Sequence, residues 1–351
     1  MPESLVQAKI ETMMEDGQIL YQQLISLIGM VFDNRYQLTD LLDVGGQGVL
    51  YIAEDSQSPH TPILMKIPLR EYHRSAYLTA EKINASRLGL QWEAHILDRF
   101  AGTIFPEFYD YFLQINPLHD TWWNTTVEAE DPFLVLEFIQ GQTLDDLIGS
   151  WHQVQQRDFH TLEDTARNIS TDILSLFENL WTAKPGFLYT DLRPQNIMIA
   201  SVTDRRGKEN WQRRRHRDPE KLNRFAPCRI DTVVRLIDAG SVVPTNPWKD
   251  RGWPHHLAYV PPEYYSLYEK GDALPWPNPD FVLYTLGKTM WQFLAGKEPV
   301  PGQDPEFDQA IWGSYSDEMV GGIKALIELR NQSFDEVRKN NPLGFKNTVT
   351  R

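Results

Sequence analysis

The apolar residues of this chain follow different patterns before and after residue 140, and this change constrains its fold more than any other feature. Before it, short apolar or alternating segments bounded by turn residues predict β-strands. They are Tyr36 to Asp43, Val49 to Glu54, Ile63 to Ile67 and Phe133 to Ile139, with one helical pattern from Leu78 to Phe100. After it, helical spacing dominates, over Leu144 to Gln155, Thr161 to Trp181, Tyr284 to Leu294 and Glu318 to Leu329. The pattern predicts an α+β chain. We expect a strand-rich part with one main helix over residues 36–138, followed by a larger, helix-rich part over residues 139–351.

Residues 1–35 form a separate pattern. Their apolar positions alternate steps of three and four, which predicts an amphipathic helix over 1–35. These positions are Ile10, Met13, Gly17, Leu20, Leu24, Leu27 and Val31. The glycine within the stripe and the short length disfavour a coiled coil. We therefore expect a helical extension that packs on the following domain.

Composition excludes several classes of protein. The 351 residues carry a net charge of −14, whereas proteins that bind nucleic acid need a basic surface. No apolar run reaches the roughly 18 residues of a membrane-spanning helix, and Met1 to Ser4 lack the basic start of a signal peptide. Cys228 is the single cysteine, so no internal disulfide or thiolate metal cluster can form. We expect a soluble, cytoplasmic protein without nucleic-acid or membrane partners.

One segment has the opposite charge. Between Asp204 and Arg224 there are nine basic residues and four acids, within a stretch, 201–226, that is poor in apolar residues. A solvated insertion explains this composition. The sharper hypothesis is a docking arm for an acidic protein partner or substrate.

Two features of the strand-rich part suit a phosphate ligand. Gly45, Gly46 and Gly48 lie between two predicted strands, where glycine lets a backbone approach phosphates closely, although a plain turn explains them equally well. Lys66 ends an apolar strand and needs an anionic partner, for which Glu93 on the next helix is available. An edge-strand lysine that reaches water is the alternative interpretation.

The strongest local signal is the segment YTDLRPQNIM, residues 189–198. Asp191 could orient or deprotonate an attacking hydroxyl, and Arg193 could hold a transferring phosphoryl group. Asn196 could bind a metal ion together with Asp238, which follows a predicted strand and precedes Ala239-Gly240. Oxygen ligands of this kind suit Mg²⁺.

Taken in order, these motifs resemble a known family. Their order resembles that in the catalytic domain of the eukaryotic-like Ser/Thr protein kinases. In this chain the motifs are the glycine-rich loop, Lys66, Glu93, Asp191 to Asn196, Asp238-Ala239-Gly240 and Pro261-Pro262-Glu263. The resemblance covers about residues 36–330. It implies a bilobal fold, with a small antiparallel sheet and one main helix over residues 36–138 and a larger helical lobe over residues 139–351. ATP would lie between the lobes, with Lys66 on its phosphates and paired to Glu93. It further implies that Asp191 is the catalytic acid/base and that Asn196 and Asp238 hold Mg²⁺.

The resemblance also implies a nucleotide pocket. Its expected residues are Gly45, Gly46, Gly48, Leu50, Leu64, Lys66, Leu136, Glu137, Ile139 and Met198. Within this set, Glu137 to Ile139 would be the hinge that binds adenine, with Leu136 behind it. Arg193 takes the place of the usual catalytic lysine, which keeps the charge but changes the geometry.

Other departures concern the pocket, its regulation and, for the last two named here, the docking of a protein substrate. They are Asp43 for the first loop glycine, Leu64 for the small residue over adenine, Thr190 for the arginine before the catalytic aspartate, Ala239 for phenylalanine, His256 for threonine and Val282 for aspartate. Without the arginine, phosphorylation of an activation loop should not be the switch. The missing aspartate normally braces the loop whose arginine is absent, so the two losses are expected to be linked.

The groups needed for phosphoryl transfer are all present. The sequence therefore favours an atypical kinase that transfers phosphate from ATP, with Mg²⁺, to a Ser or Thr of a protein. Two alternatives stay open. One is a pseudokinase that acts as a binding scaffold, supported by Asp43, Leu64 and Ala239; the other is a phosphotransferase for a small molecule.

Overall fold

The computed structural model describes residues 7–8, 17–45, 48–59, 61–68, 80–102, 104–117, 130–152, 159–201, 232–246 and 253–328. Internal contacts divide the chain into two compact units, Met1–Ile139 and Gln140–Arg351. The sequence predicts this boundary one position earlier, after residue 138. Gly46 and residues 202–226 of the basic segment lie outside the described residues.

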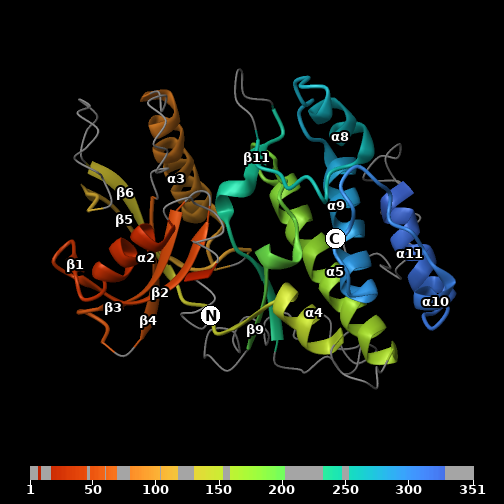
Figure 1. The fold of residues 1–351 in the computed structure, drawn as a ribbon, viewed down its shortest axis with the longest axis horizontal. Coiled ribbons are helices and arrows are strands. Elements are labelled where there is room, and N and C mark those ends of the chain that lie inside the picture. Colours follow the sequence, from red (N-terminus) through yellow and green to blue (C-terminus); the bar gives the residue numbers. More distant parts are fainter. Residues whose placement is uncertain are drawn as a thin grey trace. The chain divides into compact units, whose positions relative to one another are not determined.

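The first unit is built on a six-stranded antiparallel sheet (Figure 1). In the order in which they pair, the strands are β1 (Val31–Phe32), β2 (Tyr36–Gly45), β3 (Gly48–Asp55), β4 (Pro62–Ile67), β6 (Glu130–Glu137) and β5 (Phe108–Ile115). The main helix of this unit is α3 (Ala80–Phe100). The expected antiparallel sheet with one main helix is therefore present in this part of the chain.

A shorter helix packs on one face of the sheet. This helix, α2 (Gly17–Ser26), places Leu24 in the core with no exposed surface. The carbonyl oxygen of Leu24 accepts a hydrogen bond of 2.9 Å from the hydroxyl of Tyr51 on β3. Because burying a leucine contributes about 1.5–3 kcal/mol, this contact anchors the helix to the sheet. The expectation that the N-terminal helix packs on the following domain holds for this segment.

The predicted helix over 1–35 is wrong beyond Ser26. Gly29 adopts a left-handed φ of 92°, which favours glycine and ends the helical path. The chain then forms β1, which pairs with β2 through a turn in which Asp33 and Asn34 both have positive φ. These two residue types tolerate that conformation. The turn residues outweigh the helical spacing of the apolar residues around them.

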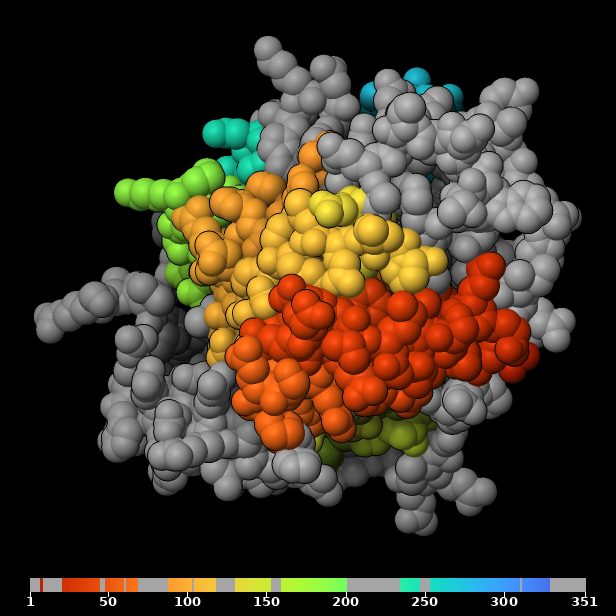
Figure 2. Space-filling model, turned by 90° about the vertical axis from the view of Figure 1, so that its left-hand side faces the viewer, coloured from red at the N-terminus to blue at the C-terminus, as the bar shows by residue number. Residues whose placement is uncertain are grey.

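The sheet curls, so that β2 and β5 meet although they are not neighbours in it. The hydroxyl of Tyr36 on β2 donates a hydrogen bond of 2.6 Å to Asp110 on β5, and the Tyr36 ring stacks on Phe112 at 5.9 Å. Phe112 in turn stacks on Phe133 of β6 at 5.3 Å. On the face in Figure 2, the red N-terminal residues lie directly beside the orange and yellow residues that come later in the chain. The aromatic rings enclosed by this curl belong to the core of the unit.

The second unit is mainly helical. Its helices are α4 (Leu144–His152), α5 (Phe159–Thr182), α8 (Pro262–Glu269), α9 (Pro279–Ala295), α10 (Gln309–Trp312) and α11 (Asp317–Glu328). Every residue from Phe281 to Ala295 is buried, so α9 is the central element of this unit. The Asn278 side chain caps its N-terminus by accepting a hydrogen bond of 2.9 Å from the Phe281 amide, and Gly296 ends it with φ 71°.

Short strands and turns connect these helices. The strands β7 (Gly141–Thr143), β9 (Ile197–Ser201) and β10 (Thr232–Leu236) form one sheet, and β8 (Phe187–Tyr189) pairs with β11 (Val242–Pro244). Two single-turn 3-10 helices, η1 (Pro194–Asn196) and η2 (Ala239–Ser241), lie in the loops between them. Among the helices in the described ranges, none is long and apolar enough to cross a bilayer.

Candidate functional site

One face of the first unit's sheet carries several residues predicted to surround a nucleotide. Strand pairing aligns Asp43 with Leu50 and Leu50 with Lys66, and it aligns Leu64 with Leu136. Directly opposite residues of paired strands point to the same face. Their neighbours along the strands fill the core on the side covered by α2, so these five side chains lie on the other face. Asp43 therefore shares the face of Lys66.

A buried ion pair joins this face to α3. The Nζ atom of Lys66 lies 2.7 Å from Oε2 of Glu93, and the two side chains are only 9% and 3% exposed. Strand β4 lies between β3 and β6, so Lys66 is not the edge-strand lysine of the alternative interpretation. Its buried charge is compensated by Glu93, and removal of one partner of such a pair costs about 3–5 kcal/mol.

Gly45 and Gly48 face each other at the end of the β2–β3 hairpin. A Cβ atom at Gly48 would lie 2.6 Å from the carbonyl oxygen of Ile67, closer than such atoms approach, so glycine is required there. Packing against β4 explains this glycine without a ligand, and phosphate binding by the hairpin stays a prediction.

The expected hinge residues are tied to the end of β6. The carboxylate of Glu137 accepts a hydrogen bond of 2.9 Å from the backbone amide of Glu107, and the Glu137 amide donates one of 2.9 Å to the Glu107 carbonyl. Ile139 is buried at the end of the first unit. Met198 lies on β9 in the second unit, paired with Arg235. Contact of these residues with adenine stays a prediction.

Strand pairing in the second unit brings together two loops that carry predicted site residues. The first loop runs from β8 to β9 and carries Asp191, Arg193 and Asn196; the second runs from β10 to β11 and carries Asp238. Since β8 pairs with β11 and β9 pairs with β10, the two loops must lie side by side. Residues more than forty positions apart in the sequence thus form one site.

Asp191 is buried and held in one orientation. The Nδ2 atom of Asn196 donates hydrogen bonds to the Asp191 carbonyl oxygen at 2.8 Å and to Oδ2 at 3.0 Å, and Nε of Arg193 lies 3.3 Å from Oδ2. The other oxygen, Oδ1, is buried without a hydrogen-bond partner among the described residues. Burial raises the pKa of Asp191; the charge of Arg193 opposes this effect, and Asp238 adds to it. A carboxylate with one oxygen held and one open can accept a proton from a hydroxyl.

Asp238 and Asn196 offer oxygen ligands beside this carboxylate. Asp238 adopts a left-handed φ of 69° and is held there by Ser241, whose hydroxyl donates to Oδ2 at 2.9 Å and whose amide donates to the Asp238 carbonyl at 3.1 Å. Strained backbone of this kind concentrates at functional sites. Because the amide nitrogen of Asn196 is bound to Asp191, its side-chain oxygen faces away from Asp191. A carboxylate and an amide oxygen fit Mg²⁺, which takes few protein ligands and completes its shell with water and phosphate.

Comparison with known proteins relates the chain to kinases. No protein-family model matches it. It is 25% identical over 302 residues to the serine/threonine-protein kinase PknA of a Nostoc species, which covers 85% of this chain and 44% of PknA. It is 26% identical over 187 residues to the serine/threonine-protein kinase ArnS of Sulfolobus acidocaldarius, an alignment that covers 53% of this chain and 26% of ArnS. It is 22% identical over 271 residues to the probable serine/threonine-protein kinase PknB of Bifidobacterium longum, which covers 76% of this chain and 31% of PknB. The chain is a divergent relative of the eukaryotic-like Ser/Thr protein kinases. It spans less than half the length of each of these three relatives.

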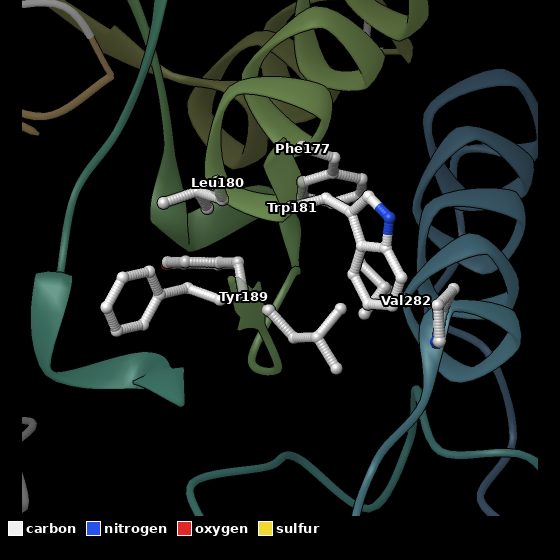
Figure 3. A pocket seen from close by; sticks show the side chains of 8 residues that line it. Phe177, Leu180, Trp181, Tyr189 and Val282 are labelled. Atoms are coloured by element: carbon white, nitrogen blue, oxygen red, sulfur yellow. The ribbon is translucent and has the colours of Figure 1, made fainter. Parts of the chain in front are cut away.

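One departure from the kinase pattern, Val282, shares a cavity with Tyr189, the residue before Thr190. Tyr189 on β8 and Val282 on α9 line one small apolar cavity with Phe177 and Trp181 of α5 (Figure 3). Both are buried, with 0% and 2% exposure. The hydroxyl of Tyr189 donates a hydrogen bond of 2.7 Å to the Ile237 carbonyl. Where the family pattern has a charged brace, this kinase relative has apolar packing around Tyr189 and Val282, next to the loop that carries Asp191.

Thr190 holds the loop that carries Asp191 in place without a charge. Its hydroxyl lies 2.7 Å from the carbonyl oxygen of Pro254 and 3.1 Å from that of Ser241, and its amide donates to Ser241 at 3.0 Å. Thr190 is 1% exposed. It therefore ties the Asp191 loop to the loop of Asp238 and to the segment that leads to His256. Burial lowers the pKa of His256. The charge of Arg193 lowers this pKa further, and the charge of Asp191 opposes the effect.

We expect Thr190→Val to destabilise the second unit by about 1–3 kcal/mol, because it removes the hydroxyl that donates to the carbonyl oxygen of Pro254 at 2.7 Å. The melting temperature should fall by about 2–4 °C for each kcal/mol lost. Thr190→Ser keeps the hydroxyl and serves as the matched control. Thermal unfolding measures both variants, and an unchanged melting temperature in Thr190→Val would contradict this role.

Sequence reasoning missed three polar residues of the second unit, Gln195, Asp145 and Lys288. Gln195 donates a hydrogen bond of 2.9 Å to Asp145 at the start of α4, which steadies the loop between Arg193 and Asn196. Lys288 on α9 is fully buried. The sequence does single out Lys288, because it is the one charged residue between Phe281 and Ala295.

Proposed function

We propose that this chain transfers the γ-phosphoryl group of ATP, in the presence of Mg²⁺, to the hydroxyl of a Ser or Thr in a protein. The similarity to three Ser/Thr protein kinases supports phosphoryl transfer to proteins in general. The observation that carries the proposal is the pair of loops in the second unit. They hold a buried Asp191 with one open oxygen beside Asp238 and Asn196.

Each residue has a role in this proposal. The acceptor hydroxyl oxygen bonds to the γ-phosphorus, the bond to the bridging oxygen breaks, ADP leaves, and the hydroxyl proton passes to Oδ1 of Asp191. Arg193 stabilises negative charge on the transferring group. Lys66, held in place by Glu93, binds phosphate oxygens. Asp238 and Asn196 would hold Mg²⁺, which neutralises charge on the phosphates when bound.

One observation favours a second candidate, a scaffold that binds partners without using ATP. Asp43 lies on the same sheet face as Lys66, two strands away. A carboxylate there repels phosphate and weakens nucleotide binding. Leu64, on the same face, adds bulk where the family has a small residue.

Incubation of the whole chain with γ-labelled ATP and a mixed protein acceptor such as casein tests the proposal. We expect labelled protein that requires Mg²⁺ and disappears with chelator. A panel of hydroxylated small molecules runs in parallel. Labelling of small molecules alone would replace the protein substrate with a metabolite. If neither acceptor is labelled and nucleotide leaves the melting temperature unchanged, the scaffold function holds instead.

A further inference from the structure

An open pocket of about 550 Å³ lies in the second unit, outside the residues assigned to phosphoryl transfer. Two segments line it, 255–258 and 298–301. The first precedes α8, and the second follows α9. This volume is within the range of pockets that bind ligands, about 300–1,000 Å³.

A buried lysine fixes both walls of the pocket. The Nζ atom of Lys288 donates a hydrogen bond of 2.9 Å to the carbonyl oxygen of Ala258 in the first wall and lies 3.5 Å from that of Val300 in the second. Lys288 has no exposed surface. The hydroxyl of Tyr259, next to the first wall, donates to the side-chain oxygen of Gln292, also on α9. The pocket is therefore preformed, which reduces the entropy lost when a ligand binds.

The first wall of the pocket is coupled to the catalytic loop. Thr190 binds the carbonyl of Pro254, the residue before His255, at 2.7 Å. The charge of Arg193 lowers the pKa of His256 in the pocket wall, and the charge of Asp191 raises it. A side chain bound in the pocket is thus close to the group that we propose accepts the hydroxyl proton.

The lining combines one negative charge with apolar surface. Glu298 is its single carboxylate, and burial lowers the pKa of His256, so that this imidazole is neutral at neutral pH. Leu257, Pro299 and Val300 supply apolar surface beside them. A side chain with an apolar stem and a cationic end matches this arrangement, because the stem packs on the wall while the charge reaches the carboxylate.

We propose that this pocket is a substrate subsite for one lysine or arginine side chain close in sequence to the acceptor hydroxyl, with Glu298 as its counter-charge. The inference rests on the proposed function. The net charge of −14 adds long-range attraction for a basic peptide. The basic segment 201–226 is not part of this proposal, and its residues 202–226 lie outside the described residues.

Synthetic peptides test the subsite. Each contains one serine in an alanine-rich, fluorescent chain, with arginine, norleucine or glutamate placed at one position at a time. Binding to the whole chain is measured by fluorescence polarisation, and phosphate transfer is measured separately on the same peptides. We expect arginine at one position to improve binding about fivefold over norleucine.

Two variants separate charge from shape. Glu298→Lys should reverse the preference from arginine to glutamate. Val300→Trp keeps Glu298 but fills the pocket, so it should abolish the preference. Glu298 and Val300 are exposed, and neither change disturbs the core. Glu318→Lys, at an exposed position on α11, is the matched control and should leave the preference unchanged.

The outcomes distinguish the two proposals. An arginine preference in binding that responds to Glu298→Lys, without any phosphate transfer, supports the subsite and contradicts the kinase function. Transfer with equal use of arginine, norleucine and glutamate at every position overturns the subsite and leaves the function standing. A preference that survives both Glu298→Lys and Val300→Trp also overturns it.

Discussion

Asp191→Asn should lower the rate of phosphate transfer by about 10²- to 10⁴-fold, the usual contribution of a general base. The amide has the same shape as the carboxylate and can still accept the hydrogen bond from Asn196. It cannot take up the proton of the acceptor hydroxyl. The loss should therefore appear in kcat, with little change in the nucleotide concentration that gives half-maximal stabilisation.

A matched variant shows whether the loss is specific. Asp272→Asn makes the same chemical change at an exposed position of the second unit and should leave transfer unchanged. Rates with Mg²⁺ and γ-labelled ATP are measured for both variants, alongside melting temperatures with and without nucleotide. Equal rates in Asp191→Asn and the unaltered chain would show that another group accepts the proton.

The parts of the site that are local in sequence could be predicted from it. Asp191, Arg193 and Asn196 fall within six residues, so their types and spacing carry the chemical signal directly. Their proximity to Asp238 is different, because it depends on the pairing of β8 with β11 and of β9 with β10. A sequence indicates that strands exist but does not say which strands pair.

Two further features, the strand β5 and the buried Lys288, could not be predicted because they depend on what each face of a strand or helix packs against. The strand β5 was not predicted. Its residues Tyr109, Leu113 and Ile115 are exposed, while Phe112 packs on the core. Because apolar residues occur on both faces, the strand lacks the alternation of apolar and polar residues that marks a half-buried strand. Lys288 was missed because an apolar helix gives no sign that the lysine end can reach two backbone carbonyls. Such contacts arise from packing between distant segments.

Removal of either partner of the buried Lys66–Glu93 pair should destabilise the first unit by about 3–5 kcal/mol. Lys66→Met leaves an uncompensated carboxylate, and Glu93→Leu leaves an uncompensated ammonium group, both on nearly unexposed side chains. The double variant should recover most of this loss, because apolar residues of similar volume often replace a buried pair at little cost. Urea unfolding of all four proteins gives the coupling between the two sites.

The same set of proteins separates stability from function. If Lys66 binds phosphate, the double variant should be stable yet inactive, because restoring the packing does not restore the ammonium group. Arg35 and Asp55 form a more exposed pair in the same unit, with 29% and 10% exposure, and should show a smaller coupling of about 1 kcal/mol. A double variant as unstable as either single variant would mean that packing of the long side chains, and not charge compensation, keeps Lys66 and Glu93 in the interior. An active double variant would instead remove Lys66 from the proposed phosphate site.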